Sequence, residues 1–307
     1  MNRKKISVLV TIVVLLLVCT SCSLLSTIGG NSTVGNTQVG GNISHLDLDD
    51  LDTSNPAAVV ASKTVSSCVR IIVTLSSGAE MNGAGFIITT DGYIVTNRHV
   101  VVQYRSGNDL PSGLSDHRIA VTQIKAVFAD NTYLEADEIM FSDNAAVDLA
   151  ILKIKPSSTT FTPIELDASS QLYYGQDAYT FGNPEGIGLL FSHATISSPA
   201  HSFKSNGTDF KDIIMLDSNV NHGNSGGVLL NSKGRAIGVV YGRIESTGST
   251  TTVNNTYGIG CALPIKEVIS FINKSTYSSI IKYVQYSEST ESDSGSEIGS
   301  GSSGSES

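Results

Sequence analysis

Residues 85–96 read Gly85-Phe86-Ile87-Ile88-Thr89-Thr90-Asp91-Gly92-Tyr93-Ile94-Val95-Thr96, two Ile-rich runs on either side of a turn. Thr90-Asp91-Gly92 is a hairpin signal, because glycine supplies the positive φ that a tight turn between twisted strands requires. The stretch therefore predicts two paired strands, 85–89 and 93–96.

Similar short apolar runs, separated by turn residues, continue on both sides of this hairpin. They cover 69–75, 120–128, 132–139 and 148–154 in the first half, and 177–181, 189–196, 213–216, 227–230, 236–241 and 257–263 in the second. After Pro264, the helical spacing of Ile265, Val268, Ile269 and Ile272 predicts a short helix over 265–272. Two sets of about six strands predict an all-β fold class, two packed six-stranded antiparallel β-barrels with a short C-terminal helix.

Only part of the 307 residues is suited to folding. Residues 28–41 are mostly Gly, Asn, Ser and Thr, and residues 287–307 are almost wholly Ser, Gly and Glu, so both segments are predicted to be linker or disordered. The net charge of −9 comes partly from this acidic tail, and the core lacks the basic stripe that nucleic-acid binding needs. Nucleic acid is therefore excluded as a partner.

The N-terminus carries an export signal. Arg3, Lys4 and Lys5 precede an apolar run, 6–18, that is shorter than the roughly 20 residues needed to span a bilayer. Cys19-Thr20-Ser21-Cys22-Ser23 follows and resembles the lipobox of bacterial lipoproteins, with Cys22 as the acylated residue; Cys19 fits less well because Val18 is branched. We expect a lipoprotein signal peptide over 1–22, a low-complexity linker over 23–56 and a lipid anchor in the bacterial cell membrane. An uncleaved signal anchor and an ordinary secreted protein are the alternatives.

Cys68 and Cys261 are the two cysteines of the globular region, each in an apolar run. Export permits a disulfide between them, but a buried cysteine is also an ordinary small apolar residue. The sequence leaves the two possibilities open.

The segment His222-Gly223-Asn224-Ser225-Gly226-Gly227 is suited to a nucleophilic serine. Such a serine needs a tight loop that also presents backbone N–H groups to a carbonyl oxygen, and Gly223 can turn its N–H toward a developing oxyanion. The structural alternative is a glycine-rich hairpin turn.

A nucleophilic serine needs a base and the base needs an orienting carboxylate. Among six histidines, His99 closes the predicted strand 93–97, a position where a histidine is usually structural. Asp148 places a carboxylate in the apolar run 146–152, where it must be buried and requires a fixed partner such as an imidazole N–H. The alternative for Asp148 is a structural role as a cap at the start of a strand. Asp143 would then be the next candidate for the orienting carboxylate.

The order His99, Asp148, Ser225 over two β-rich halves matches the chymotrypsin architecture. The segments 83–88, 91–101, 148–152, 221–227 and 258–264 resemble HtrA-type (Deg) trypsin-like serine proteases, over about residues 57–272. The resemblance implies a triad of His99, Asp148 and Ser225 between two barrels, an oxyanion hole of the Gly223 and Ser225 N–H groups, polypeptide substrates, and no metal or cofactor. It also places Asn219 near the base of the specificity pocket, and since Asn219 is uncharged, no strong preference for Lys or Arg is expected.

Two features depart from that family. We expect no PDZ domain after the predicted protease domain, 57–275, because residues 276–307 end in the Ser/Glu/Gly tail. His222 and Val228 replace prolines usual beside the nucleophile loop, which affects backbone stiffness rather than chemistry. A non-catalytic peptide-binding module on the same fold is the main alternative. A serine esterase is a third possibility, but its Gly-x-Ser-x-Gly turn lies between strand and helix. The oligomeric state is not predicted.

Overall fold

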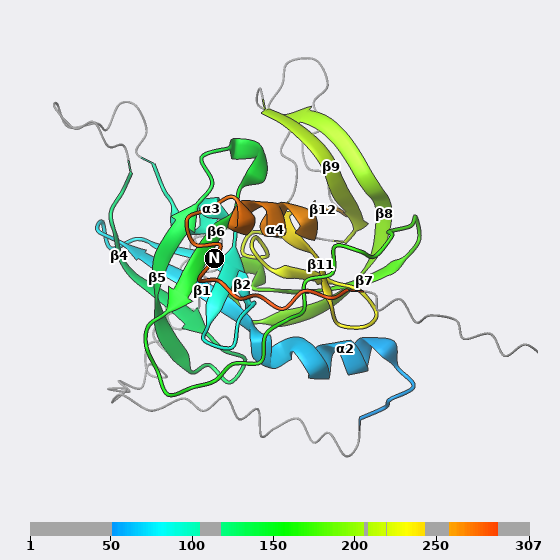
Figure 1. Ribbon diagram of the computed structural model, residues 1–307, viewed down its shortest axis with the longest axis horizontal. Coiled ribbons are helices and arrows are strands. Elements are labelled where there is room, and N and C mark those ends of the chain that lie inside the picture. Colours follow the sequence, from blue (N-terminus) through cyan, green and yellow to red (C-terminus); the bar gives the residue numbers. More distant parts are fainter. Residues whose placement is uncertain (1–50, 105–117, 206–207, 219, 243–257, 288–307) are drawn as a thin grey trace, which may run out of the picture. The chain divides into compact units, whose positions relative to one another are not determined.

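The computed structural model describes residues 51–104, 118–205, 208–218, 220–242 and 258–287 (Figure 1). All of them lie in one compact unit, 39–307. The predictions for Cys22, for Asn219, for the signal peptide and for the tail beyond 287 fall outside these residues.

Six strands close the first barrel in the order β1-β2-β3-β6-β5-β4. They are β1 (Cys68–Leu75), β2 (Glu80–Ile87), β3 (Tyr93–Thr96), β4 (Val121–Val127), β5 (Tyr133–Phe141) and β6 (Ala150–Ile154). β2 pairs with β3 through Phe86 and Val95, and Gly92 has a φ of 92° in the turn between them. The hairpin expected from the sequence is therefore part of this barrel.

Six further strands close the second barrel in the order β10-β11-β12-β9-β8-β7. They are β7 (Asp177–Gly182), β8 (Leu190–Ser205), β9 (Thr208–Asp217), β10 (Val228–Leu230), β11 (Ala236–Gly242) and β12 (Ile259–Pro264). β8 and β9 are longer than expected because their pairing continues outward to Phe203 and Phe210 and then to Ser205 and Thr208, as the long ribbon of Figure 1 shows. The predicted all-β double barrel is confirmed.

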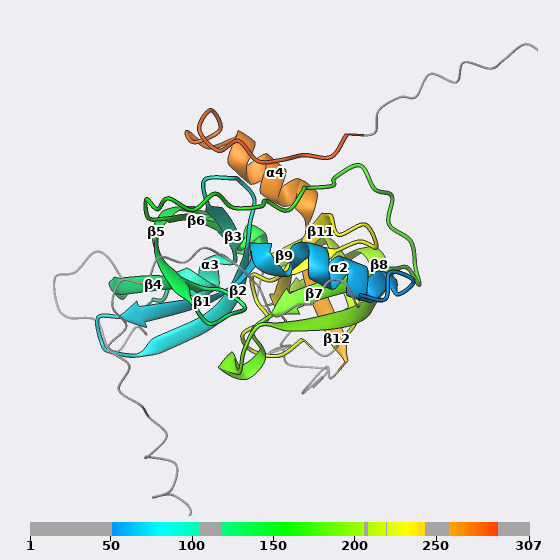
Figure 2. The ribbon, with the colours of Figure 1, turned by 90° about the horizontal axis from the view of Figure 1, so that it is seen from below.

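Short helices flank the barrels (Figure 2). They are α2 (Pro56–Thr64), η3 (Val65–Ser67), α3 (Arg98–Val101), η4 (Ala145–Val147), η5 (Pro184–Gly186) and α4 (Ile265–Asn273). α4 is the predicted C-terminal helix and buries Ile265, Val268 and Ile272. α2 was not expected; it begins where the Asn55 side chain accepts hydrogen bonds from the Ala57 and Ala58 N–H groups.

Each barrel has a core of its own, and a third cluster of buried side chains joins them. Ile71, Ile94 and Leu152 belong to the first core, while Ile214 and Leu229 belong to the second. The joining cluster contains buried residues of both barrels and of α4, among them Phe86, Leu149, Phe181, Val228 and Val268. Burial of this shared apolar surface holds the two barrels against each other.

The linker between the barrels is fixed to barrel two and to the C-terminal segment. Leu166 forms parallel bridges with Ala236 and with Gln285, and its N–H donates to the Val284 carbonyl at 2.8 Å. Arg235 binds Glu165 at 3.0 Å and lies 3.4 Å from the centre of the Tyr286 ring. The chain beyond the predicted boundary at 275 therefore packs on the barrels.

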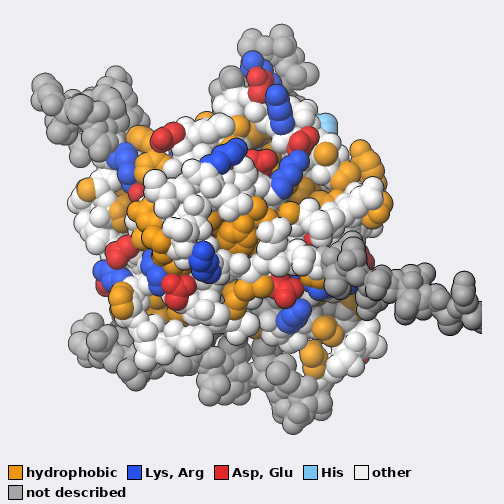
Figure 3. All heavy atoms as spheres, in the orientation of Figure 1, with side chains coloured by type: hydrophobic (Ala, Val, Ile, Leu, Met, Phe, Trp, Pro, Cys, Tyr) orange, Lys and Arg blue, Asp and Glu red, His pale blue; other side chains and the backbone are white. Residues whose placement is uncertain are grey.

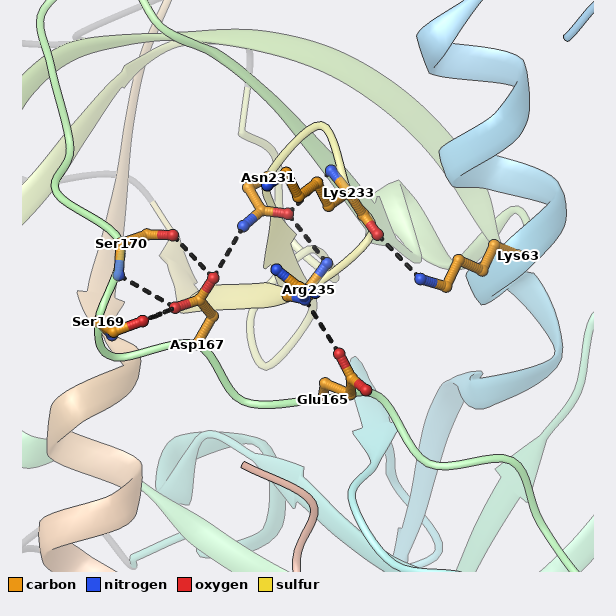
Figure 4. Close-up of polar contacts among 8 residues, drawn as sticks. All are labelled: Lys63, Glu165, Asp167, Ser169, Ser170, Asn231, Lys233 and Arg235. Atoms are coloured by element: carbon orange, nitrogen blue, oxygen red, sulfur yellow. Dashed lines mark hydrogen bonds and ion pairs between the residues drawn. The ribbon is translucent and has the colours of Figure 1, made fainter. Parts of the chain in front are cut away.

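A buried carboxylate anchors the same linker, as Figure 4 shows. Asp167 is 2% exposed and accepts hydrogen bonds from the hydroxyls of Ser169 (2.9 Å) and Ser170 (2.7 Å) and from the Asn231 amide (3.2 Å). Burial alone would raise the pKa of Asp167, but the bonds from the hydroxyls and N–H groups of Ser170 and Ser169 hold it below its ordinary value.

Cys68 and Cys261 are both buried and are not joined by a disulfide bond. The Cys68 thiol instead donates to the Thr64 carbonyl at 3.3 Å, and burial strongly raises its pKa. Acidic and basic side chains are interspersed on the face shown in Figure 3. Within the described ranges, no helix is both long enough and apolar enough to cross a membrane.

Candidate active site

His99 and Asp148 meet at one edge of the first barrel. His99 lies in α3, directly after β3, and Asp148 lies in the turn that precedes β6. Two hydrogen bonds fix the Asp148 main chain beneath α3, because its carbonyl accepts from the Asn97 amide (2.8 Å) and from the Arg98 N–H (3.1 Å). Because β3 and β6 are neighbouring strands, His99 and Asp148 meet although they are 49 positions apart in the sequence.

The Asp148 carboxylate is buried and serves His99 with both oxygens. Its Oδ1 accepts from the His99 backbone N–H at 3.0 Å, and its Oδ2 hydrogen bonds to Nδ1 of the imidazole. An ionised carboxylate only accepts, so Nδ1 carries the proton and Nε2 is left as the basic nitrogen. Arg98 adds a cation 3.8 Å from Oδ1, while Asp143 lies exposed in the preceding turn.

Ser225 lies in the loop between β9 and β10, and this loop docks on the first barrel. The Ser225 carbonyl accepts from the Ala84 N–H of β2 at 2.9 Å. Gly226 has a φ of 84°, and a Cβ there would lie 2.2 Å from the Ala84 carbonyl oxygen and 3.0 Å from the Asn97 nitrogen. Glycine is therefore required for the close approach that brings Ser225 beside the strand end that carries His99.

The Ser225 hydroxyl donates to the carbonyl of Tyr241 at 3.2 Å. No hydrogen bond between Ser225 and His99 occurs among the described residues. The Tyr241 ring lies 5.9 Å from the His99 imidazole. Hydrogen bonds of a catalytic serine are often long or misaligned without substrate and tighten when substrate binds. In this structure the Ser225 hydroxyl is therefore bound to the Tyr241 carbonyl and not to His99.

The peptide group between His222 and Gly223 is held in one orientation. The His222 carbonyl accepts from the Glu185 N–H at 2.7 Å, and the Gly223 carbonyl accepts from the Asn183 N–H at 3.2 Å. Because C=O and N–H point in opposite directions across a trans peptide, the Gly223 N–H points away from η5. In the described part of the chain neither the Gly223 nor the Ser225 N–H has an acceptor. Two such donors on one loop can bind an oxyanion.

Sequence reasoning missed three neighbours of this site: Arg98, Tyr241 and Asn97. Arg98 could have been noticed as a charge next to His99, but nothing in the sequence distinguished Tyr241, which is at the end of a predicted strand. Asn97 is fully buried, and its Oδ1 has no hydrogen-bond partner among the described atoms. The described residues contain no group of three or more His, Cys, Asp or Glu side chains that could hold a metal ion.

The chain was compared with known proteins. The family model for the trypsin-like peptidase domain matches residues 83–239, which is 157 of 307 residues. "Protease Do-like 1, chloroplastic" of Arabidopsis thaliana is 29% identical over 195 residues, covering 63% of this chain and 39% of the relative. "Probable periplasmic serine endoprotease DegP-like" of Chlamydia trachomatis is 31% identical over 184 residues, covering 60% of this chain and 31% of the relative.

Among solved structures, "HtrA-type protease AlgW with tripeptide" superposes with a TM-score of 0.53 and 25% identity, covering 71% of this chain and 64% of that one. The chain thus spans less than two thirds of the length of these relatives. The likeness to HtrA-type trypsin-like serine proteases is consistent between sequence and structure.

Proposed function

Because the chain belongs to the trypsin-like peptidase family, we propose that it is a serine endopeptidase that hydrolyses polypeptides through His99, Asp148 and Ser225. One observation carries the proposal. A buried carboxylate, Asp148, binds both the main chain and the imidazole of His99, at the strand end on which the Ser225 loop docks. A buried charge so placed is costly unless its partner is fixed, and the arrangement supplies an oriented base beside a serine.

The proposed reaction proceeds in two acyl transfers. Nε2 of His99 takes the Ser225 proton while Oγ attacks the carbonyl carbon of the substrate, and the imidazolium then protonates the leaving amine. Water, deprotonated by the same nitrogen, attacks the acyl-enzyme and releases the acid and the free serine. Asp148 holds the tautomer and stabilises the imidazolium in both steps.

The oxyanion of each tetrahedral intermediate would lie against the N–H groups of Gly223 and Ser225. The bond from Glu185 to the His222 carbonyl favours this use, because it holds the Gly223 N–H turned away from η5 before any substrate arrives. A donor that is already oriented costs no reorganisation at the moment of reaction.

Substrates are proposed to be extracytoplasmic proteins. The name of the Chlamydia relative includes "periplasmic", and the N-terminal sequence has the features of an export signal. In this proposal Cys22 carries a lipid that anchors the chain to the cell membrane, and Asn219 gives the specificity pocket an uncharged base.

A second candidate is a non-catalytic module that binds peptides at the same site. The contact that favours it is the one between the Ser225 hydroxyl and the Tyr241 carbonyl, which leaves the serine turned from its base. The two candidates differ in whether Ser225 is nucleophilic.

Labelling with a fluorophosphonate probe separates them. We expect the wild type to be labelled on Ser225, and Ser225→Ala and His99→Ala to abolish labelling without changing the thermal midpoint by more than a few degrees. His193→Ala is the matched control, since His193 also pairs with an aspartate, Asp177, at 2.8 Å but is exposed and has no described contact with Ser225. A folded wild type that is never labelled would support the binding module.

A further inference from the structure

Tyr241 contacts two members of the candidate triad from the end of β11. Its ring lies 5.9 Å from the His99 imidazole at an interplanar angle of 72°, and its carbonyl accepts the hydrogen bond of the Ser225 hydroxyl. His99 belongs to the first barrel, whereas Tyr241 and Ser225 belong to the second. The Tyr241 ring of the second barrel therefore contacts His99, the proposed base, across the junction of the barrels.

The imidazole needs such a contact. Among the described residues, one side-chain hydrogen bond, between Nδ1 and Asp148, holds the ring, and 47% of the His99 side chain is exposed. One bond fixes a point but leaves the ring free to pivot about it, so Nε2 could turn away from Ser225. An aromatic ring at edge-to-face distance limits this pivoting, because such pairs prefer centroids 4.5–7 Å apart in tilted or perpendicular arrangements.

Tyr241 is itself held in place by a row of aromatic side chains. Its ring packs against Phe210 at 5.6 Å and 64°, and Phe210 stacks on Phe203 at 5.0 Å and 15°. Phe203 and Phe210 are paired residues of β8 and β9. The row connects the outer part of the β8–β9 ribbon with His99, so the position of the imidazole depends on packing within the second barrel.

The phenol stays neutral while doing this. Burial, and then the charge of Asp148, raises the pKa of Tyr241 to about 12, with Arg98 opposing the shift. A neutral ring next to the imidazole adds no charge that would compete with Asp148.

We propose that Tyr241 is a positioning residue whose ring holds the His99 imidazole with Nε2 toward Ser225. The proposal concerns the ring and not the hydroxyl, for which no described residue is a hydrogen-bond partner. It rests on the proposed function only for its kinetic readout, because the position of His99 can also be measured directly.

The test compares Tyr241→Phe and Tyr241→Ala with a matched control, Tyr179→Ala. Tyr179 is a buried tyrosine of the same barrel that stacks on Phe191 and His193 and has no contact with His99. The first readout is the rate of labelling by a small fluorophosphonate, which needs no peptide-binding subsites and so reports the base and nucleophile. We expect Tyr241→Ala to be slowed about 10- to 100-fold per folded molecule, as a base displaced by about 1 Å would be. Tyr241→Phe and Tyr179→Ala should stay within about threefold of the wild type.

The second readout is the low-field proton resonance of the His99 Nδ1–H, assigned by its loss in Asp148→Asn. We expect it in the wild type, in Tyr241→Phe and in Tyr179→Ala, and broadened by exchange in Tyr241→Ala. A Tyr241→Ala protein that keeps the wild-type resonance overturns the proposal whatever its labelling rate, and a Tyr241→Phe protein that loses the resonance overturns it too, because the hydroxyl would then be the group that acts. If the wild type is never labelled, the proposed function fails, and the resonance alone decides the role of Tyr241.

Discussion

Replacing Gly223 with alanine tests the proposed oxyanion hole. Gly223 has a φ of 92°, and an added Cβ would lie 2.0 Å from the Asn183 carbonyl oxygen, so the backbone must move by about 1 Å to reach a tolerable 3.0 Å. The movement disrupts the two hydrogen bonds by which Glu185 and Asn183 hold the orientation of the His222–Gly223 peptide. Loss of one oxyanion donor costs about 10²–10³ in kcat, or about 3–4 kcal/mol of transition-state stabilisation.

Gly175→Ala is the matched control. Gly175 has a φ of 78° in the same barrel, but an added Cβ would meet nothing within 4 Å. Both variants therefore carry the cost of a left-handed backbone, about 1–2 kcal/mol, and only Gly223→Ala carries the collision. The assay is kcat on a peptide substrate together with the free energy of unfolding. If Gly223→Ala keeps turnover within threefold of Gly175→Ala, the Gly223 N–H does not bind the oxyanion.

Three more outcomes are expected. Asp148→Asn should fold and lose about 10⁴ in kcat, because the amide favours the wrong tautomer of His99; near-normal turnover at an unchanged thermal midpoint would remove Asp148 from the triad. Because the folded-state pKa of Asp167 is lowered, its stabilisation is present above the unfolded value near 4 and is lost as pH falls through the folded value. Denaturant titrations between pH 5 and pH 2 should show a shallower fall for Ser170→Ala than for the wild type, and equal slopes would contradict this role. Palmitate incorporation should depend on Cys22, and label kept in Cys22→Ser would contradict the lipobox assignment.

The sequence predicted the architecture well because its main signals are local. Each strand of both barrels overlaps one of the short apolar runs predicted from the sequence, and Gly92 makes the expected turn. α2 was missed because its nine residues, Pro56–Thr64, bury only Val60 and Thr64 and so lack a clear apolar stripe. The outward extension of β8 and β9 was missed because strand pairing beyond the core needs no apolar alternation.

Prediction of the candidate site depended on the kind of signal each residue leaves. Asp148 could be found because a carboxylate within an apolar run is costly and implies a partner. Ser225 could be found because glycines surround it in the sequence. The structure shows why Gly226 must be glycine: an added Cβ would collide with the Ala84 carbonyl oxygen. Tyr241 could not be found, because an aromatic residue at a strand end is common and only the closure of the second barrel against α3 places it beside His99.

The division of the candidate triad between the barrels affects the order in which the site can assemble during synthesis. During synthesis the first barrel can assemble the His99–Asp148 pair alone, since β3 and β6 are both within it. Ser225 follows Asp148 by 77 residues in the chain. It joins the pair when its carbonyl accepts the hydrogen bond from the Ala84 N–H. In the proposed mechanism, a chain in which only the first barrel has folded would hold the base without the nucleophile. Under the proposed function, peptide cleavage would begin only after this docking, when both barrels are folded.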